Sequence, residues 1–353
     1  MYKYIFRPLL FLFSPETIHH VIAWNLRNLC RLPGGRKFLR AIYAYRRNDL
    51  KREVFGIKFP NPIGLPAGFD KNGDLYREMT GLGFGFVEVG TVTPKAQPGN
   101  PKPRSFRLPK DRALVNRMGF NNDGLENMME NLAQRKASEN IVLGINLGKN
   151  TATPNDEAPH DYLKLFRNLY PLADYFVVNV SCPNVKDITA LQNRDGVLAI
   201  LEPMFAYRDR QAVYRPILLK ISPDLANEDI DTMIDTVLPT PLDGIVATNT
   251  TTSRAGLHTP REEVERLGNG GLSGAPLTHR AIEVVRRVHQ RSGGRYPIIG
   301  VGGIMTPQDA QQMLDAGASL VQAFTGFIYG GPFFAKRVCK YLSKQKGRNL
   351  KTK

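Results

Sequence analysis

The sequence predicts a parallel (β/α)8 barrel preceded by a small two-helix amphipathic extension. Eight short apolar runs follow one another along the chain, and each is followed by a stretch with helical spacing of its apolar residues. Nearly every run ends in glycine or in polar residues, as strands do where a barrel builds its site. This alternation is typical of an α/β barrel, although by itself it also fits a doubly wound sheet. The chain of 353 residues is long enough for one such domain with an appendage.

The first element that the sequence predicts is a helix over residues 14–31. Ser14 is a suitable N-cap, Pro15 suits the first helical position and Glu16 lies in the first turn. Apolar residues then recur at helical spacing up to the Pro-Gly-Gly that ends the helix. A second short amphipathic helix is expected over 36–47. Two such helices with basic flanks favour an interfacial anchor, and simple docking onto the main domain is the alternative.

The charge of the chain is concentrated at its two ends. Of the net charge of +16, residues 1–52 carry +9 and residues 336–353 carry +8, which leaves −1 for the body. Basic ends beside apolar residues favour an anionic membrane surface over a nucleic acid. A solvated basic tail is the alternative for 336–353. The apolar run Leu9–Phe13 is far shorter than the roughly 18 residues of a membrane span and lacks the cleavage site of a signal peptide.

From residue 60 onward the strand–helix alternation gives each remaining element. The predicted strands are 62–67, 84–90, 141–147, 175–181, 216–221, 243–248, 297–302 and 319–324. The predicted helices are 74–82, 123–136, 159–171, 195–206, 226–237, 278–291, 306–316 and 332–344. We therefore divide the chain into an extension over 1–50, a barrel over 51–345 and a basic tail over 346–353.

The residues at the strand ends predict the kind of ligand. They are mostly lysines, asparagines, threonines and glycines, almost without carboxylates or histidines. That set argues against paired-carboxylate hydrolysis and against a metal site. It offers hydrogen bonds to a ligand rich in carbonyls, amides and phosphate. Glycines in GVGG (300–303) and FTG (324–326), with GGLSG upstream, favour a phosphate held by backbone N–H groups.

Three cysteines stand far apart in the sequence, which argues against a disulfide scaffold or a zinc site and favours a reducing compartment. One of them, Cys182, lies in the strand end NVSCPN, between Asn179 and Asn184. A buried structural thiol is the usual role of a cysteine. Its place between two candidate site asparagines favours a chemical role instead.

Ten stretches in order resemble the dihydroorotate dehydrogenases, and specifically their membrane-associated, quinone-dependent class 2. The resemblance covers nearly the whole chain and is carried by PIGLPAGFDKNG, EVGTVTPKAQPGNPKPRSFRLP, LVNRMGFNNDG, GINLGKN, NVSCPN, KISPD, ATNTT, GGLSGAPL, GVGGI and FTGFIYGGP. The two N-terminal helices, with SPETIHH, resemble the quinone-access extension of class 2. The resemblance implies oxidation of dihydroorotate to orotate in pyrimidine synthesis, with bound FMN.

Position by position, the resemblance also implies the site residues. FMN contacts are expected from Ala67, Gly68, Lys71, Thr91, Asn146, Asn179, Lys220, Thr248, Gly274, Gly303, Phe324 and Thr325. Substrate contacts are expected from Lys71, Asn116, Arg117, Met118, Gly119, Phe120, Asn179, Asn184, Asn249 and Thr250. His19 and Arg107 match positions that line the quinone site. Asparagine can match the amide edges of dihydroorotate with both donors and acceptors, and lysine supplies charge for its carboxylate.

The resemblance places the catalytic base, which removes a proton from C5, at Cys182. Class 2 enzymes generally have serine there and class 1 enzymes cysteine, so this chain combines a class 2 body with a class 1-like base. A thiol titrates near pKa ~8.5 and is a better base at neutral pH than a hydroxyl. Phe324 is a second departure, because the family often has tyrosine at that position.

The sequence leaves several alternatives open. A soluble-type enzyme that uses fumarate or NAD would suit the cysteine, but it would have no use for the basic extension. A flavin barrel acting on another pyrimidine fits the NRMGF and TNTT motifs less well. The extension could also dock a protein partner. We expect a monomer, peripheral on the cytoplasmic face of a bacterial membrane, that binds dihydroorotate, a quinone and anionic lipid but no nucleic acid.

Overall fold

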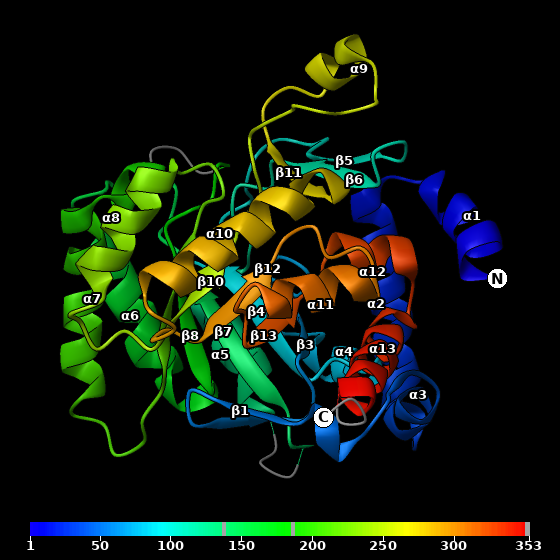
Figure 1. Ribbon diagram of the computed structural model, residues 1–353, viewed down its shortest axis with the longest axis horizontal. Coiled ribbons are helices and arrows are strands. Elements are labelled where there is room, and N and C mark those ends of the chain that lie inside the picture. Colours follow the sequence, from blue (N-terminus) through cyan, green and yellow to red (C-terminus); the bar gives the residue numbers. More distant parts are fainter. Residues whose placement is uncertain (136–138, 185–187, 350–353) are drawn as a thin grey trace.

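Eight parallel strands close into a barrel in the computed structural model, which describes residues 1–135, 139–184 and 188–349 (Figure 1). Around the barrel the strands are β3 (Ile63–Leu65), β4 (Phe86–Val92), β7 (Val142–Leu147), β8 (Tyr175–Asn179), β9 (Ile217–Ile221), β10 (Gly244–Ala247), β12 (Ile298–Val301) and β13 (Leu320–Gln322). Each corresponds to one predicted strand. The predicted barrel is therefore confirmed, and the doubly wound sheet is excluded.

Helices follow the strands and cover the outside of the barrel, as the sequence predicted. They are α4 (Tyr76–Gly81), α5 (Gly124–Ala133), α6 (Ala158–Leu169), α7 (Arg194–Arg208), α8 (Asn227–Val237), α10 (Thr278–Arg291), α11 (Pro307–Asp315) and α13 (Phe334–Asn349). A short helix, α12 (Thr325–Gly330), was not predicted. Helix α13 includes the first four residues of the predicted tail 346–353, and the last four lie outside the described residues. The end of the helix predicted over 123–136 also lies outside them.

A two-stranded hairpin closes the amino-terminal end of the barrel. It consists of β1 (Arg52–Val54) and β2 (Ile57–Phe59), which pair antiparallel. Val54 and Phe59 are buried against inward-facing barrel residues that include Phe86 and Leu218. Because this end is filled with apolar side chains, a polar ligand can enter the barrel only at the carboxyl ends of its strands.

The N-terminal extension contains more helix than the sequence predicted. Its elements are η1 (Tyr2–Phe6, a π-helical turn), α1 (Arg7–Phe11), α2 (Pro15–Arg31) and α3 (Gly35–Tyr43). The Ser14 hydroxyl caps α2 by accepting a hydrogen bond of 3.1 Å from the Thr17 amide, as predicted. Helix α3 ends four residues early, because Ala44 is already extended. In the described part of the chain, no helix is long and apolar enough to cross a membrane.

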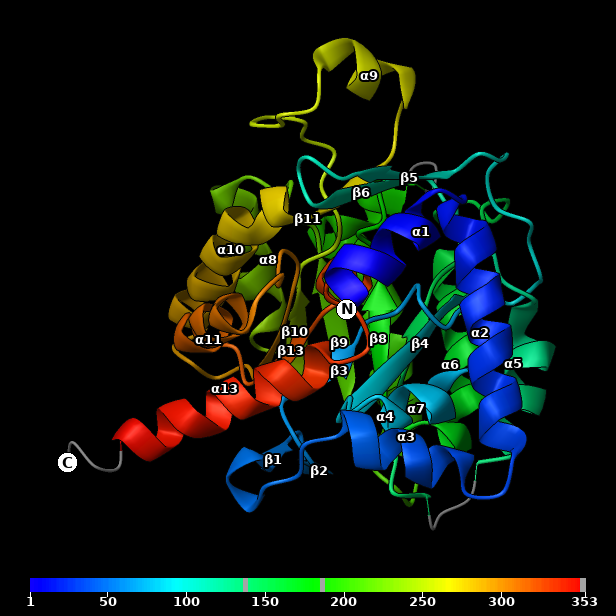
Figure 2. The same cartoon turned by 90° about the vertical axis from the view of Figure 1, so that its right-hand side faces the viewer.

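A small antiparallel sheet lies over the carboxyl ends of the barrel strands, and the sequence did not predict it (Figure 2). It consists of β5 (Ser105–Leu108), β6 (Ala113–Asn116) and β11 (Gly271–Gly274), in the order β11-β6-β5. An arm that carries α9 (Arg261–Arg266) projects beyond it. The sheet matters for function because β6 and β11 bring Asn116 and Gly274 over the barrel opening.

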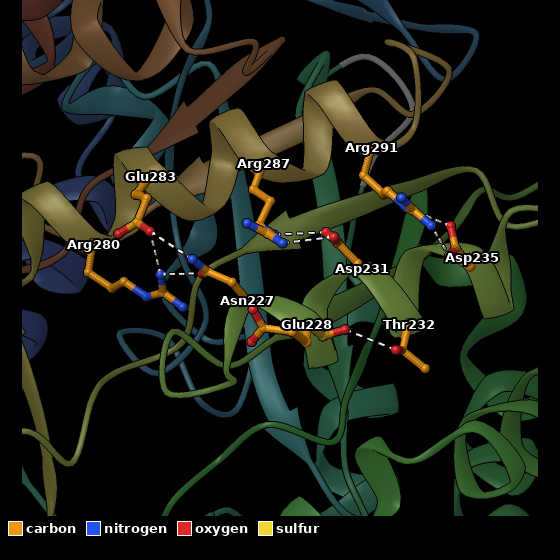
Figure 3. A network of polar contacts seen from close by, with 9 residues as sticks. All are labelled: Asn227, Glu228, Asp231, Thr232, Asp235, Arg280, Glu283, Arg287 and Arg291. Atoms are coloured by element: carbon orange, nitrogen blue, oxygen red, sulfur yellow. Dashed lines mark hydrogen bonds and ion pairs between the residues drawn. The ribbon is translucent and has the colours of Figure 1, made fainter.

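A row of arginine contacts joins α10 to α8 on the outside of the barrel (Figure 3). Arg287 forms two hydrogen bonds of 2.8 Å with the Asp231 carboxylate. One helical turn away Arg291 pairs with Asp235, and at the other end Arg280 donates to the Asn227 side chain at 2.8 Å. These groups are partly exposed, so they fix the register of two neighbouring helices more than they add stability.

Candidate active site

A cavity of about 950 Å³ lies between the carboxyl ends of the barrel strands and helices α1 and α2. At the barrel it is lined by polar side chains, among them Lys71, Asn179 and Lys220. Beneath the extension it is lined by apolar side chains such as Ile18 and Leu26. One continuous space therefore has a polar end suited to a small hydrogen-bonding ligand and an apolar end suited to a hydrophobic one.

A chain of amides and hydroxyls forms the floor of the polar end. Asn179, the last residue of β8, donates from Nδ2 to Oδ1 of Asn146 at 2.9 Å. The Thr91 hydroxyl donates to the same Asn146 oxygen at 2.5 Å. Asn249 follows β10 and donates from Nδ2 to Oδ1 of Asn179 at 3.2 Å. Four strands thus contribute to one network, and the orientation of each amide depends on that of its neighbour.

A buried carboxylate sets the orientation of this network. Glu88 on β4 is fully buried and accepts hydrogen bonds of 2.8 Å from Nδ2 of Asn146 and from Nε2 of Gln322. A carboxylate can only accept, so Asn146 must turn its NH2 toward Glu88 and its oxygen toward Thr91 and Asn179. Sequence reasoning missed Glu88 and Gln322. The signal was present, since a Glu inside a run as apolar as FGFVEVG must have polar partners when buried.

The loop after β8 brings Cys182 and Asn184 to the cavity. The Cys182 side chain is 8% exposed, is not in a disulfide and lies among the cavity-lining residues. Nδ2 of Asn184 donates to Oδ1 of Asn116 at 3.2 Å, which joins this loop to β6 of the small sheet. Nδ2 of Asn249 donates to the Ser181 hydroxyl at 3.1 Å. The thiol is thus held between groups that can bind the amide edges of a ligand.

Lys71 is one of the basic residues at this end of the cavity, and helix α2 supplies a carboxylate near it. Burial lowers the pKa of Lys71 to about 8, and Glu16 on α2 opposes that shift. Glu16 also accepts a hydrogen bond of 2.7 Å from Nη2 of Arg104, whose guanidinium is nearly buried. Arg104 in turn donates to the Asn100 carbonyl at 3.0 Å. Glu16 and Arg104 therefore tie the start of α2 to the loop beside the site, and sequence reasoning had given neither a role in the site.

The residues at the polar end fit a flavin mononucleotide. The Gln322 side-chain oxygen is buried and has no hydrogen-bond partner among the described residues, as expected where a ligand supplies the donor. Lys220 is 6% exposed and lines the cavity, so a cation is available for an anionic ring edge. Gly274 and Gly303 have φ of 104° and 69° and also line it, which lets backbone approach a phosphate closely.

The apolar end begins with an aromatic cluster. The His19 ring of α2 contacts the edge of Phe69 at 4.8 Å between centroids, and Phe69 contacts Phe324 at 5.6 Å. Burial lowers the pKa of His19 to about 3, and the positive charge of Lys71 adds to the shift. Arg107 on β5 donates to the Phe13 carbonyl at 2.6 Å and lies over the Phe11 ring at 4.4 Å. A neutral imidazole and a held guanidinium thus flank the channel.

Most of the predicted site residues line this one cavity. They are His19, Ala67, Gly68, Lys71, Thr91, Arg107, Asn116, Met118, Gly119, Phe120, Asn179, Cys182, Asn184, Lys220, Thr248, Asn249, Thr250, Gly274, Gly303, Phe324 and Thr325. Asn146 is not among the lining residues, but it accepts hydrogen bonds from Thr91 and Asn179, which do line the cavity.

Arg117 is the predicted substrate residue whose side chain is directed elsewhere. Its guanidinium donates to the carbonyls of Leu267 and Pro103, the latter at 2.9 Å, and lies over the Phe106 ring at 4.8 Å. It therefore fastens the arm and the small sheet together, while its neighbours in the same motif reach the cavity. The motif identified the segment, but only the fold shows which of its side chains point inward.

Comparison with known proteins identifies, over almost the whole chain, the same family that the sequence motifs resemble. The family model described as dihydroorotate dehydrogenase matches residues 49–345. A relative from Christiangramia forsetii named dihydroorotate dehydrogenase (quinone) is 48% identical over 338 residues, which cover 96% of this chain and 97% of that protein. One of the same name from Thermobifida fusca is 47% identical, covering 96% of this chain and 90% of that protein. A crystal structure titled DHODH in complex with ferulenol from Eimeria tenella is similar with a TM-score of 0.85 at 35% identity, covering 95% and 92% of the two chains.

Proposed function

The chain belongs to the dihydroorotate dehydrogenase family, and from this premise we propose that it oxidises (S)-dihydroorotate to orotate, with FMN as hydride acceptor and a membrane quinone as terminal oxidant. The reaction is a step of pyrimidine (UMP) biosynthesis. The observation that carries the proposal is the continuous cavity, which joins the polar ring and Cys182 to the apolar channel under α1 and α2. Residues 1–50 provide quinone access and the membrane contact, and residues 51–345 provide the barrel.

Dihydroorotate is bound at the polar end. Lys71 pairs with its carboxylate, because the ammonium lies in a buried setting where an anion is its natural partner. Asn179, Asn249 and Asn184 bind its ring amides with the donors and acceptors that remain after Asn249 donates to Asn179 and Asn184 donates to Asn116. Thr250 and the segment from Asn116 to Phe120 complete the contact, with Arg117 left outside it as a structural residue.

Cys182 is the general base. Its thiolate removes the proton from C5 of dihydroorotate while a hydride leaves C6, so that the C5–C6 bond becomes a double bond and the thiol carries the proton. The thiol is held in a buried loop that lines the cavity, which fixes its distance from a substrate bound by the neighbouring asparagines. A base of this kind contributes on the order of 10² to 10⁴ in rate.

FMN, when bound, supplies a two-electron acceptor for that hydride. Lys220 would stabilise negative charge on the reduced ring, and the buried Gln322 oxygen would accept a hydrogen bond from the cofactor. The phosphate is bound by backbone at Gly274, Gly303 and Thr325. Contacts to the ring are also made by Ala67, Gly68, Thr91, Asn179, Thr248 and Phe324, supported from behind by Asn146.

The quinone enters from the membrane through the apolar channel. His19 stays neutral at physiological pH because of its lowered pKa, so it offers a hydrogen bond without a charge. Arg107 flanks the same channel. Phe324 offers no hydroxyl, so a quinone hydrogen bond must come from other groups. Exposed apolar side chains on η1, α1 and α2 favour peripheral attachment to the membrane. We propose the cytoplasmic face for this contact.

One experiment separates this proposal from the soluble alternative. Purified, FMN-loaded protein is given dihydroorotate with a ubiquinone analogue, a menaquinone analogue, fumarate or NAD as acceptor. Fast turnover with a quinone alone is expected, because an apolar channel binds an apolar quinone better than a polar oxidant. Turnover with fumarate or NAD and none with either quinone would refute the quinone assignment and favour the soluble-type alternative, which the names of the relatives do not favour.

A further inference from the structure

The two basic ends of the chain meet on one face of the molecule. Helices α1, α2, α3 and α13 all lie on the side turned to the viewer in Figure 2. Helix α13 directly contacts the end of the extension. Lys336 donates to the Ile42 carbonyl, the Ser343 hydroxyl donates to the Asp49 carboxylate at 2.6 Å, and Lys346 donates to the Asp49 carbonyl at 2.9 Å. Sequence positions almost 300 residues apart thus form one surface.

Helix α13 has three sides that differ in their neighbours. Apolar residues such as Val338 and Leu342 are buried against the barrel. Arg337, Lys340 and Lys344 are exposed, and their spacing of three and four residues places them in one row along the helix. This row borders the side that contacts the extension, since Lys340 also lies over the Tyr45 ring at 5.9 Å. The basic row therefore continues the surface of the extension.

The same surface carries most of the exposed apolar residues. Twelve of the fifteen large apolar side chains that are exposed in the described part of the chain lie within residues 1–38. Phe333, just before α13, is another and packs against Tyr43 at 4.7 Å. Phe38 on α3 is 59% exposed. Exposed apolar residues beside a row of cations are the pattern of an interfacial surface, in which rings enter the lipid and lysines remain at the phosphates.

We propose that the row Arg337, Lys340 and Lys344 of α13 is a second membrane contact, which binds the phosphates of an anionic bilayer beside the N-terminal extension. This inference rests on the proposed function in one respect only, namely that the protein binds to a membrane. It means that the basic row of the C-terminal helix contacts lipid headgroups rather than solvent alone. Because α13 is fastened to residues 42–49, two contacts on one rigid body fix the orientation of the channel mouth toward the lipid, which a single flexible anchor does not.

The test is flotation of the full-length, FMN-loaded protein with lipid vesicles. The variant Lys340→Gln/Lys344→Gln removes two charges and keeps good helix formers in the row. The control Lys164→Gln/Arg210→Gln removes two exposed charges, one from α6 and one from the turn that follows α7, and these helices lie on the other side of the barrel from α13 (Figure 1). Vesicles contain phosphatidylcholine alone or phosphatidylcholine with phosphatidylglycerol. Thermal unfolding checks that each variant is folded, and dihydroorotate oxidation with a soluble dye acceptor tests the proposed function separately.

A basic residue near an anionic leaflet contributes about fivefold to partitioning, so the double variant is expected to bind phosphatidylglycerol vesicles about 25-fold more weakly than wild type. The control should bind like wild type, and on phosphatidylcholine all three should bind alike. Equal flotation of the double variant and wild type on anionic vesicles would overturn the proposal. An equal loss in the control would overturn it too, because only total charge would then matter. Flotation does not depend on turnover, so a wild type without dihydroorotate oxidation would refute the proposed function and leave this result intact.

Discussion

Glu88 gives the sharpest test of how the site is held together, through two substitutions that remove the same charge. In Glu88→Leu the N–H groups of Asn146 and Gln322 lose their acceptor inside the protein. Each buried, unsatisfied donor costs about 1–3 kcal/mol, so we expect the free energy of unfolding to fall by about 2–6 kcal/mol.

Glu88→Gln should cost much less. The oxygen of the new amide can accept from Asn146, and its NH2 faces Gln322. In the FMN-free protein Gln322 can turn its own amide over, because its oxygen has no partner among the described residues and can then accept from that NH2. Two charge-assisted hydrogen bonds become two neutral ones, which we expect to cost about 1–2 kcal/mol.

Urea unfolding of the two variants and wild type without FMN measures both differences, with orotate affinity of the FMN-loaded forms as the second readout. Only the leucine variant frees Asn146 to turn, so only it should weaken orotate binding through Asn179. Glu78→Gln is the control, because it removes another buried carboxylate, on α4. A leucine variant as stable as the glutamine variant would show that desolvation of the carboxylate dominates and would refute this reasoning.

The remaining predictions concern the base, two titrations and the outer barrel. Cys182→Ala should lower kcat about 10²- to 10⁴-fold with little change in orotate affinity, and an unchanged kcat would remove Cys182 from its role. Orotate affinity should weaken as pH rises through about 8, because neutral Lys71 no longer pairs with a carboxylate, and Lys71→Met should bind weakly at every pH without this dependence. His19 has a folded pKa near 3, below its unfolded value of about 6.5, so it makes stability fall on acidification between these values by at most about 1.4 kcal/mol per pH unit. His19→Leu should have a shallower pH dependence of unfolding in that range, and an identical one would contradict the lowered pKa. The Arg208 side chain is 1% exposed and pairs with Asp243 at 2.7 Å. Arg208→Met should therefore lower the free energy of unfolding, measured by heat or urea, by about 3–5 kcal/mol, and a loss under about 1 kcal/mol would contradict a buried pair.

The barrel strands and the polar residues at their ends could be predicted from the sequence for a local reason, whereas the role of each site residue was implied by the family resemblance. A strand of a parallel barrel is buried on both faces, so it appears as a continuous apolar run, and its end is marked by the residues that must bind or turn there. The run that ends in NVSCPN therefore gave β8, Asn179 and Cys182 together. The caps of α2 are local as well, and Ser14 caps that helix as predicted.

Elements inserted between the strand–helix units could not be predicted in the same way. The strands of the small sheet come from residues 105–116 and 271–274, and each is only four residues long. They form a sheet because β6 pairs with a strand more than 150 residues away, and nothing local in either segment requires that pairing. The direction of the Arg117 side chain follows from this sheet and could not be predicted from the sequence either.

The sequence by itself determined the repeat of the barrel, the chemical character of the strand ends and the basic charge of both termini, because each depends on residues that are neighbours along the chain. Only the tertiary structure decided which of these parts meet. It set Glu88 beneath Asn146 and Gln322, brought Glu16 of α2 to Arg104 and placed α13 against the N-terminal extension. Such contacts depend on how the closed sheet folds the chain back on itself, and that path is fixed by packing over the whole barrel.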